Sequence, residues 1–537
     1  MTAIGLDLGT SRVKAVLFDD DWRARATADE ATAVAHPGGG RSEQDMDEVW
    51  AAAVRVLADV GRAARDLGGT TRGGAGAGGS GGSGGSGSGA SGPGGGVDVI
   101  AVTGQGDGCW LVDDAGRPVR PAMLWNDARA EPVVAGWEAD GTLERTFRRT
   151  GTWGSAGLAN AQLRWLADHE PAVAGRAATL LSCGSWVYQQ LTGRRVLDVS
   201  EAVPFLDARS AGYDESLLDD YGLREQQRLL PPVVRQGSRA GSLSADAAAA
   251  VGLPAGTPVV LAPYDLVTAA TGSGVARAGQ AFAVLGTTLC VGVLADDPAL
   301  DRPLNGLTLP TGRPGQWLLA YPTMCGTEVL DWMAGLLGLP GPAALIDLAA
   351  QSTRGPGSAV AAGGPAAGSG REGGAGAAAG PLVLPYFSPA GERSPFRDSG
   401  ARGAVLDLTT EVTRADVARA TVDGLTLAVL DCFLACGGAD VLSVSGGGAR
   451  SAAWCQAIAD AIGRPVHRTD TAEAGALGAA LTGAVEIGVF PDVATAVDRT
   501  VVVERVYEPF PARDAAYRQR LGELTVARAV VRTATTR

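Results

Sequence analysis

The chain has 537 residues, which is too long for a single hydrophobic core and predicts two domains of ordinary size or larger. Its composition, 46% hydrophobic and 19% charged, is typical of a globular protein. A formal net charge of −13 argues against nucleic acid or an anionic membrane as a partner. No apolar run is long enough to cross a bilayer and no signal peptide precedes the first motif, so we expect a cytoplasmic protein.

The first predicted element is a hairpin over residues 4–19, in which two short apolar strands are joined by the turn Asp-Leu-Gly-Thr-Ser at 7–11. The turn offers backbone N–H groups and two hydroxyls to an anion, and one carboxylate to a cation. This combination suits a metal-bound nucleotide phosphate, and an ordinary hairpin with a polar turn is the alternative. Lys14, the only lysine in the sequence, lies beside this turn, on the second strand of the hairpin.

Two low-complexity segments interrupt the chain. Residues 68–97 are dominated by Gly and Ser, and residues 354–380 by Gly and Ala. Neither segment holds enough apolar surface to offset the entropy of ordering it, so we expect two flexible surface insertions. The first separates a helix expected over residues 46–67 from a buried strand expected over residues 97–102, and therefore lies inside a domain.

Strands and helices alternate along the rest of the chain, which predicts an α/β fold. A strand is expected over residues 258–261, followed by Asp265 and a small-residue helix over 267–274. A second hairpin, residues 279–293, carries the turn Gly-Thr-Thr at 286–288. Its strand–turn–strand form repeats that of the opening motif.

A third turn follows a helix expected over residues 413–436 and a strand expected over 441–445. Three glycines, at 446–448, precede a helix that runs through Ile462. Glycines let a flat group approach the backbone at a helix N-terminus, where N–H donors are free, so this turn suits a base and ribose. The three turns together predict a cleft that holds a nucleotide from opposite sides.

These motifs resemble the actin-like ATPase superfamily and, within it, the FGGY carbohydrate kinases. The other segments that carry the resemblance, in the same order, are residues 43–45, 103–108, 125–129, 198–202, 252–259, 391–395, 446–451 and 473–480. The resemblance covers nearly the whole chain outside the two insertions. It implies two actin-like (ribonuclease H-like) domains, residues 1–274 and 275–537, with the sugar bound mainly to the first domain and ATP mainly to the second.

The resemblance also implies roles for single residues. Asp265 matches the general-base aspartate of the family, with capping of the following helix as the alternative, and Asp7 would act on Mg²⁺. The residues assigned to ATP are Gly9, Thr10, Ser11, Lys14, Gly286, Thr287, Thr288, Gly446, Gly447, Gly448 and Ser451. The residues assigned to the acceptor are Gln105, Gly106, Asp107, Trp125, Arg129 and Trp153, together with Asp265.

Three of the acceptor residues have a structural alternative. Asp107 could cap its turn, Arg129 could pair with Asp127, and Trp153 could be a core side chain. The sequence also departs from the family at two signature positions, where Gln162 stands in place of a lysine and Asp407 in place of a glycine. Both positions are interpreted as structural.

The predicted function is ATP-dependent phosphorylation of a terminal hydroxyl on a small polyol or ketose. The turn around Gly106 and Asp107 looks closest to erythritol kinases, with L-xylulose kinases next, and D-xylulose, ribulose and glycerol as alternative acceptors. The alternative of another class is an actin-like, nucleotide-switched binding or regulatory protein, which needs no acceptor base. The expected partner is thus a small-molecule polyol or ketose, and a homodimer is an assembly that the sequence allows.

Overall fold

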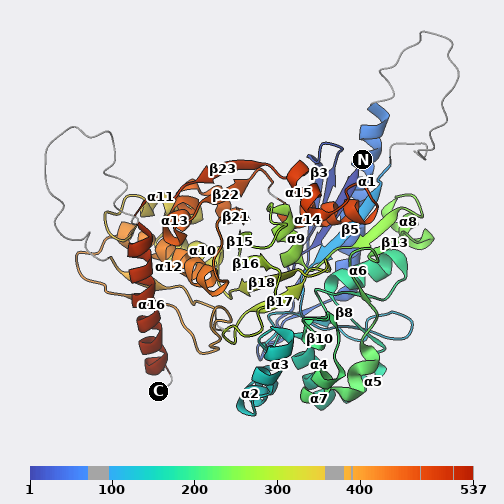
Figure 1. The fold of residues 1–537 in the computed structure, drawn as a ribbon, viewed down its shortest axis with the longest axis horizontal. Coiled ribbons are helices and arrows are strands. Elements are labelled where there is room, and N and C mark those ends of the chain that lie inside the picture. Colours follow the sequence, from blue (N-terminus) through green and yellow to red (C-terminus); the bar gives the residue numbers. More distant parts are fainter. Residues whose placement is uncertain (71–95, 357–379, 389–390, 472, 512, 536–537) are drawn as a thin grey trace, which may run out of the picture.

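The computed structural model describes residues 1–70, 96–356, 380–388, 391–471, 473–511 and 513–535. Two sheets, one in each half of the chain, form the framework, and helices cover their faces (Figure 1). The predicted α/β fold is confirmed. The predictions for the insertions at 68–97 and 354–380 lie for the most part outside the described residues.

The first sheet has six strands in the order β13 (Ala240–Ser242), β14 (Pro258–Leu261), β5 (Val99–Gly104), β1 (Ala3–Leu8), β2 (Arg12–Phe18) and β3 (Ala24–Ala31). Strands β1 and β2 form the opening hairpin, with Asp7 opposite Lys14. Strand β5 runs parallel to both β1 and β14, so these three strands end at the same edge of the sheet. The predicted phosphate turn, the acceptor turn and Asp265 follow their ends.

One face of this sheet packs against α1 (Met46–Thr70), α6 (Cys183–Thr192) and α8 (Ala245–Val251). The other face packs against α14 (Ala474–Glu486) and α15 (Val493–Thr500), which come from the second half of the chain. In Figure 1 both helices lie beside β5, next to α9 (Asp265–Gly272). The boundary at residue 274 stays a prediction, and α14 joins the two halves.

Helices α9 and α14 approach each other backbone to backbone. A Cβ built on Gly272 would overlap the carbonyl of Ala474, and one built on Gly478 would overlap the carbonyl of Thr268. Only glycine permits so close an approach at these two positions.

The second sheet has seven strands in the order β17 (Leu307–Pro310), β18 (Trp317–Pro322), β16 (Leu289–Ala295), β15 (Ala281–Leu285), β21 (Leu442–Ser445), β22 (Val466–Thr469) and β23 (Val503–Tyr507). The helices around it are α10 (Thr327–Leu336), α11 (Pro342–Ala349), α12 (Arg414–Ala435), α13 (Ala452–Ile462) and α16 (Arg513–Thr535). The predicted second hairpin is β15–β16, and β21 enters the predicted glycine turn.

A helical region extends the first half at the bottom of Figure 1. Its helices are α2 (Glu131–Ala139), α3 (Thr142–Thr150), α4 (Ala159–His169), α5 (Pro171–Arg176) and α7 (Glu215–Asp220). The short strands outside the two main sheets are β4 (Glu43–Gln44), β6 (Trp110–Val112), β7 (Ala122–Met123), β8 (Thr179–Leu181), β9 (Leu197–Asp198), β10 (Leu206–Asp207), β11 (Gly212–Tyr213), β12 (Val233–Val234), β19 (Leu382–Leu384) and β20 (Ala404–Leu406). None of the helices in the described ranges is long and apolar enough to cross a membrane.

Candidate active site

The predicted phosphate turn meets the start of α14. Asp7 lies near the end of β1, where the turn begins. A Cβ built on Gly475 would overlap the carboxylate of Asp7. Lys14 Nζ lies 2.5 Å from a carboxylate oxygen of Glu473, the residue before α14. Burial raises the pKa of Asp7 to about 6, against the opposing charge of Lys14. The turn is thus tied to the second half of the chain by an ion pair.

A chain of hydrogen bonds joins this turn to the acceptor turn. Gln105 is buried, and its Oε1 accepts from Thr10 Oγ1 at 2.9 Å while its Nε2 donates to Gln44 at 2.8 Å. Thr10 Oγ1 in turn accepts from Trp125 Nε1 at 2.9 Å. Gln105, Thr10 and Trp125 were predicted to contact substrates, and here their polar groups bind one another. Of the remaining turn residues, Gly9 is half-buried and Ser11 is exposed.

Gly106 packs against the ring of Tyr264, and Asp107 is the next residue of the turn. A Cβ built on Gly106 would overlap that ring, so the turn requires glycine here. Asp107 follows with a φ of 56°, in the left-handed region that non-glycine residues rarely adopt. Burial raises the pKa of Asp107 to about 6, while Arg393 and a hydrogen bond from Tyr264 act in the opposite direction.

Asp265 is the first residue of α9 and follows Tyr264, whose backbone N–H donates to Ser200 Oγ at 2.9 Å. Burial raises the pKa of Asp265 well above the usual aspartate range, and the negative charges of Asp7 and Asp107 raise it further. The fold therefore brings three carboxylates from three strand ends into electrostatic contact. A carboxylate with a raised pKa is a stronger proton acceptor than an ordinary one.

Arg393 completes this group from the second half of the chain. Its Cζ lies 4.8 Å from the ring centroid of Trp125, and its Nε donates to the carbonyl of Pro322. Its loop is held by the buried carboxylate of Glu392, which accepts from the backbone N–H groups of Met324 and Arg393, both at 2.8 Å. The sequence showed this segment as part of the resemblance, but no pattern within it indicated which residue would reach the other half.

A cavity beside these residues is built from both halves. Asp107 and Trp153 line it from the first half, and Leu307, Arg393 and Ser394 line it from the second. The backbone N–H of Trp153 donates to the carbonyl of Gly306 at 3.0 Å, which joins the two walls. The indole Nε1 of Trp153 is buried and has no hydrogen-bond partner among the described residues.

Arg129 lies apart from this cavity. It is 6% exposed, and its Nε and Nη2 donate to the two oxygens of Asp127 at 2.9 and 2.7 Å. Its Nη2 also lies 2.5 Å from Glu43. The structural pairing that the sequence left open for Arg129 is present, and it fixes the loop that carries Trp125.

The second predicted phosphate turn joins β15 to β16. The carbonyl of Gly286 accepts from the backbone N–H of Thr327 at 2.8 Å, and Thr287 is exposed while Thr288 is half-buried. A Cβ built on Gly326 would lie 2.6 Å from the carbonyl oxygens of Gly286 and Thr287, so the start of α10 packs directly beneath this turn.

The glycine turn after β21 is open on one side. Gly446 has a φ of 89°, and a Cβ built on Gly448 would overlap the ring of Trp454. No heavy atom of the described chain lies within 4 Å of a Cβ built on Gly447. Ser451 caps α13, accepting from the backbone N–H of Trp454 at 3.2 Å. The backbone at Gly447 is thus accessible to a flat ligand.

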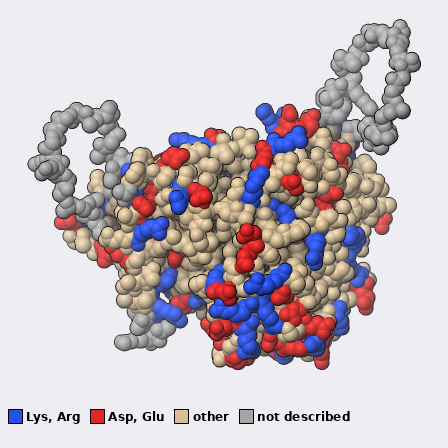
Figure 2. All heavy atoms as spheres, in the orientation of Figure 1, with Lys and Arg blue, Asp and Glu red and all other residues tan. Residues whose placement is uncertain are grey.

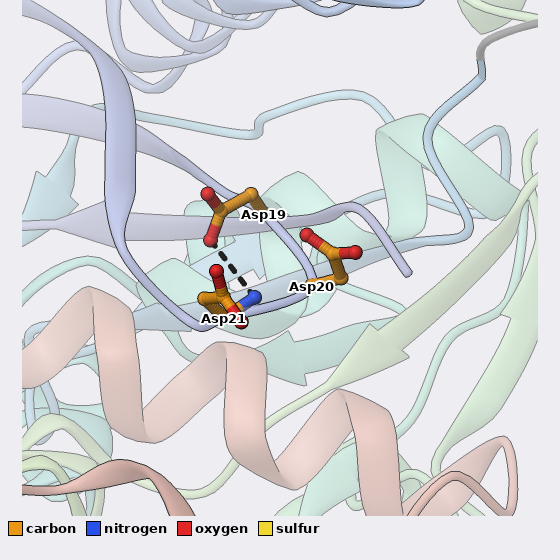
Figure 3. A group of neighbouring side chains, drawn as sticks. All are labelled: Asp19, Asp20 and Asp21. Carbon is orange, nitrogen blue, oxygen red and sulfur yellow. Dashed lines mark hydrogen bonds between the residues drawn. The ribbon is translucent and has the colours of Figure 1, made fainter.

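Three further carboxylates gather at Asp19, Asp20 and Asp21, in the turn between β2 and β3 (Figure 3). Asp19 already accepts from the backbone N–H groups of Asp21 and Arg23, at 3.0 and 2.9 Å, and from the side chain of Arg25. This cluster is a closed turn at the surface and is separate from the carboxylates around Asp265.

Comparison with known proteins decides the family. The profile of the FGGY family of carbohydrate kinases, N-terminal domain, matches residues 2–73 and 91–272, and that of the C-terminal domain matches residues 281–487. The chain belongs to the FGGY family of carbohydrate kinases. This FGGY kinase is therefore a phosphotransferase with an alcohol group as acceptor and with ATP as a substrate, and the predicted resemblance is confirmed.

Individual relatives cover nearly the whole of this FGGY kinase. It is 33% identical to an erythritol kinase of Brucella abortus (strain 2308), over 98% of this chain and 94% of the relative. It is 29% identical to a xylulose kinase of Escherichia coli (strain K12), over 89% of this chain and 88% of the relative. The crystal structure of xylulose kinase from Rhodospirillum rubrum superposes with a TM-score of 0.80 and 26% identity, over 100% of both chains. The predicted two-domain sugar-kinase architecture is confirmed.

Proposed function

We propose that this FGGY kinase phosphorylates a terminal hydroxyl of a small polyol or ketose, and that erythritol or L-xylulose is its acceptor. The observation that supports the proposal is the cavity that Asp107 and Arg393 line from the two halves, together with the electrostatic interaction of both residues with Asp265 at the start of α9. The turn of Gly106 and Asp107, and the 33% identity to an erythritol kinase, favour a tetritol.

In the proposed reaction, Asp265 accepts the proton of the acceptor hydroxyl as its oxygen attacks the γ-phosphorus of ATP. The new oxygen–phosphorus bond forms while the bond to the β-phosphate oxygen breaks, and its electron pair leaves with ADP. The raised pKa of Asp265 makes its carboxylate a suitable base for this step.

The neighbouring residues orient the acceptor. Asp107 can accept hydrogen bonds from two hydroxyls, and Arg393 can donate to a hydroxyl or carbonyl oxygen from the opposite wall. Trp153 lines the cavity and offers an apolar surface to the carbon chain. The backbone of the turns at 7–11 and 286–288 would hold the phosphates, and the open backbone at Gly447 would hold the nucleoside.

Mg²⁺ fits the donors of this site, because carboxylate oxygens that repel one another favour a divalent cation between or beside them. Asp7 would hold the ion, directly or through water, since its carboxylate lies at the phosphate turn and its pKa is raised to about 6. When bound, the ion would neutralise charge on the transferred phosphoryl group.

The test is the substitution Asp265→Asn, which keeps the size of the side chain and removes the base. We expect kcat to fall by about 10³ while ADP binding stays unchanged, because general-base catalysis contributes on this scale. Asp20→Asn, in the exposed turn after β2, is the matched control and should keep full activity. Full turnover in Asp265→Asn would refute the base assignment.

The acceptor is identified by measuring kcat/KM across tetritols, pentitols, pentuloses and glycerol with an ATP-coupled assay. We expect erythritol or L-xylulose to give the highest value. A protein that consumes no ATP with any of these compounds would contradict the proposed substrate class.

A further inference from the structure

A second cavity lies between the two halves, with a volume of about 290 Å³. The first half contributes the turn between β10 and β11, with Arg209, and the segment after β12, with Arg235. The second half contributes residues 310–317, where β17 turns into β18. This cavity shares no lining residue with the acceptor cavity, so it is a separate site.

The walls of this cavity carry positive charge without acidic residues. Three of its lining residues are arginines, Arg209, Arg235 and Arg313, and none is Asp or Glu. Figure 2 shows that basic side chains gather locally on the visible face although the chain carries a net charge of −13. A net negative charge of the whole chain is therefore compatible with a pocket whose walls are locally positive.

The three guanidinium groups are poorly neutralised. Within the described chain, no carboxylate lies at ion-pair distance from Arg235 or Arg313, and Arg209 lies 4.0 Å from Asp297 at the surface. Arg313 Nη1 donates to the carbonyl of Ala276 at 2.9 Å, and Arg235 Nη2 to that of Ala211 at 3.1 Å. Each guanidinium group keeps N–H donors in reserve, since it has five.

The positive charge of Arg313 lies in an unfavourable electrostatic environment. Burial and the positive charge of Arg239 lower the pKa of Arg313 to about 10, and the negative charge of Asp492 compensates only in part. Arg239 itself is paired with Asp198 at 2.7 Å, so its own partner is already engaged. An anion bound beside Arg313 would offset the free-energy cost of burying its positive charge.

We propose that this cavity binds the phosphate group of a small phosphorylated metabolite. Planar guanidinium groups recognise phosphate oxygens through paired hydrogen bonds, which an isolated surface charge does not provide. The ring of Trp317, fixed by a hydrogen bond from Nε1 to the carbonyl of Ala208 at 2.8 Å, and Pro310 form an apolar wall for a short carbon chain.

Two short connections lead from this cavity to the acceptor site. Strand β17 begins at Leu307, in the acceptor cavity, and ends at Pro310, in the arginine cavity, roughly 10 Å away along an extended strand. Val199 lines the arginine cavity, and the next residue, Ser200, accepts from the backbone of Tyr264. A phosphate bound here would contact residues of both halves, and it would therefore influence how the two halves are positioned relative to each other.

The test uses the full-length kinase with saturating ADP, so that the nucleotide site is occupied. Inorganic phosphate and glycerol 3-phosphate are titrated by calorimetry into the unmodified protein, Arg235→Gln and the double variant Arg235→Gln/Arg313→Gln. We expect saturable binding to the unmodified protein, and a Kd at least about tenfold higher in the double variant, because charged hydrogen bonds are lost. Without added phosphate, kcat/KM should stay unchanged.

Arg62→Gln on α1 removes the same charge at an exposed site and should bind both ligands normally. Tighter binding of glycerol 3-phosphate than of inorganic phosphate would identify an esterified ligand, and equal binding would identify free phosphate. Equal affinity in all variants, or no saturable binding at millimolar concentration, would overturn the proposal. Arg235 is exposed, so its single variant remains informative if the double variant fails to fold. ADP binding alone reports on the nucleotide site, which separates this test from that of the proposed function.

Discussion

Gly106 is the residue on which the shape of the acceptor turn depends most directly. Its backbone packs against the ring of Tyr264, and the hydroxyl of the same side chain donates a hydrogen bond to Asp107. The turn therefore holds the carboxylate in place through a contact that no larger residue allows. Tyr264 also precedes Asp265, so one aromatic ring positions both the acceptor turn and the start of α9.

Gly106→Ala is expected to displace Tyr264, and with it Asp107. Because a misplacement of about 1 Å can cost about 10² in rate, kcat/KM for the acceptor should fall by one to two orders of magnitude. Gly136→Ala in α2 is the matched control, since no described atom lies within 4 Å of a Cβ built there. Steady-state kinetics with both variants checks this, and an unchanged kcat/KM in Gly106→Ala would contradict the packing argument.

The pH dependence of catalysis follows from the raised carboxyl pKa values. An aspartate whose pKa is raised takes up its proton at a higher pH than free aspartate, whose pKa is about 3.9. Asp7 and Asp107 have pKa values of about 6, and that of Asp265 lies well above its usual range. As the pH is lowered, these carboxylates become protonated, and we expect kcat/KM to begin to fall at a pH of about 6 or higher. A profile that stays flat down to about pH 4 would contradict this.

At the scale of single elements, the contact between α9 and α14 joins the base to the phosphate turn. Helix α9 begins at Asp265, and α14 begins beside Asp7 and Glu473. Their glycines bring the two backbones together, so a change in the distance between the helices would move both sites.

Gly478→Ala should therefore destabilise the protein by about 1–3 kcal/mol, the usual cost of overpacking a tight interface. Gly522→Ala in α16 is the control, because a Cβ built there meets no described atom within 4 Å and alanine favours a helix. Denaturant unfolding measures both variants. A Gly478→Ala protein as stable as the unmodified one would show that the interface relaxes without cost.

Most elements could be predicted from local patterns. The hairpins at 4–19 and 279–293, the strand at 258–261 and the helix expected at 413–436 are present, the last as α12. The sheet against which α14 packs could not be predicted. The small residues of α14 indicate that it packs closely against another element, but they do not indicate which sheet this is. Asp407 has a φ of 59°, which gives a physical reason for the glycine at that position of the family signature.

At the scale of the whole molecule, the acceptor cavity exists only where the two halves meet. Local sequence motifs placed Asp107 and Asp265 at strand ends, and topology brings them together. The contributions of Arg393 and Tyr264 escaped prediction because they depend on contacts between segments distant in the chain, such as Arg393 over Trp125. No spacing rule within a segment reports such a contact.

Because the cavity needs both halves, binding of the acceptor and of ADP should be coupled. We expect the acceptor with the highest kcat/KM to lower the Kd of ADP at least about fivefold. In Arg393→Met this factor should approach one, since the side chain that bridges to Trp125 is lost. Calorimetric titration of ADP with and without acceptor measures the coupling, with the exposed Arg402→Met as control. Undiminished coupling in Arg393→Met would exclude a bridging role for that residue.

The ion pair between Lys14 and Glu473 has one more consequence, which arises from composition. Lys14 is the only lysine in the sequence, so the chain carries a single ε-amine, and that amine lies at the junction of the two halves. An amine-selective acylating reagent therefore has one side-chain target besides the N-terminus. The rate at which Lys14 is labelled would report how often its ion pair with Glu473 opens, and so how firmly the start of α14 is held to the opening hairpin.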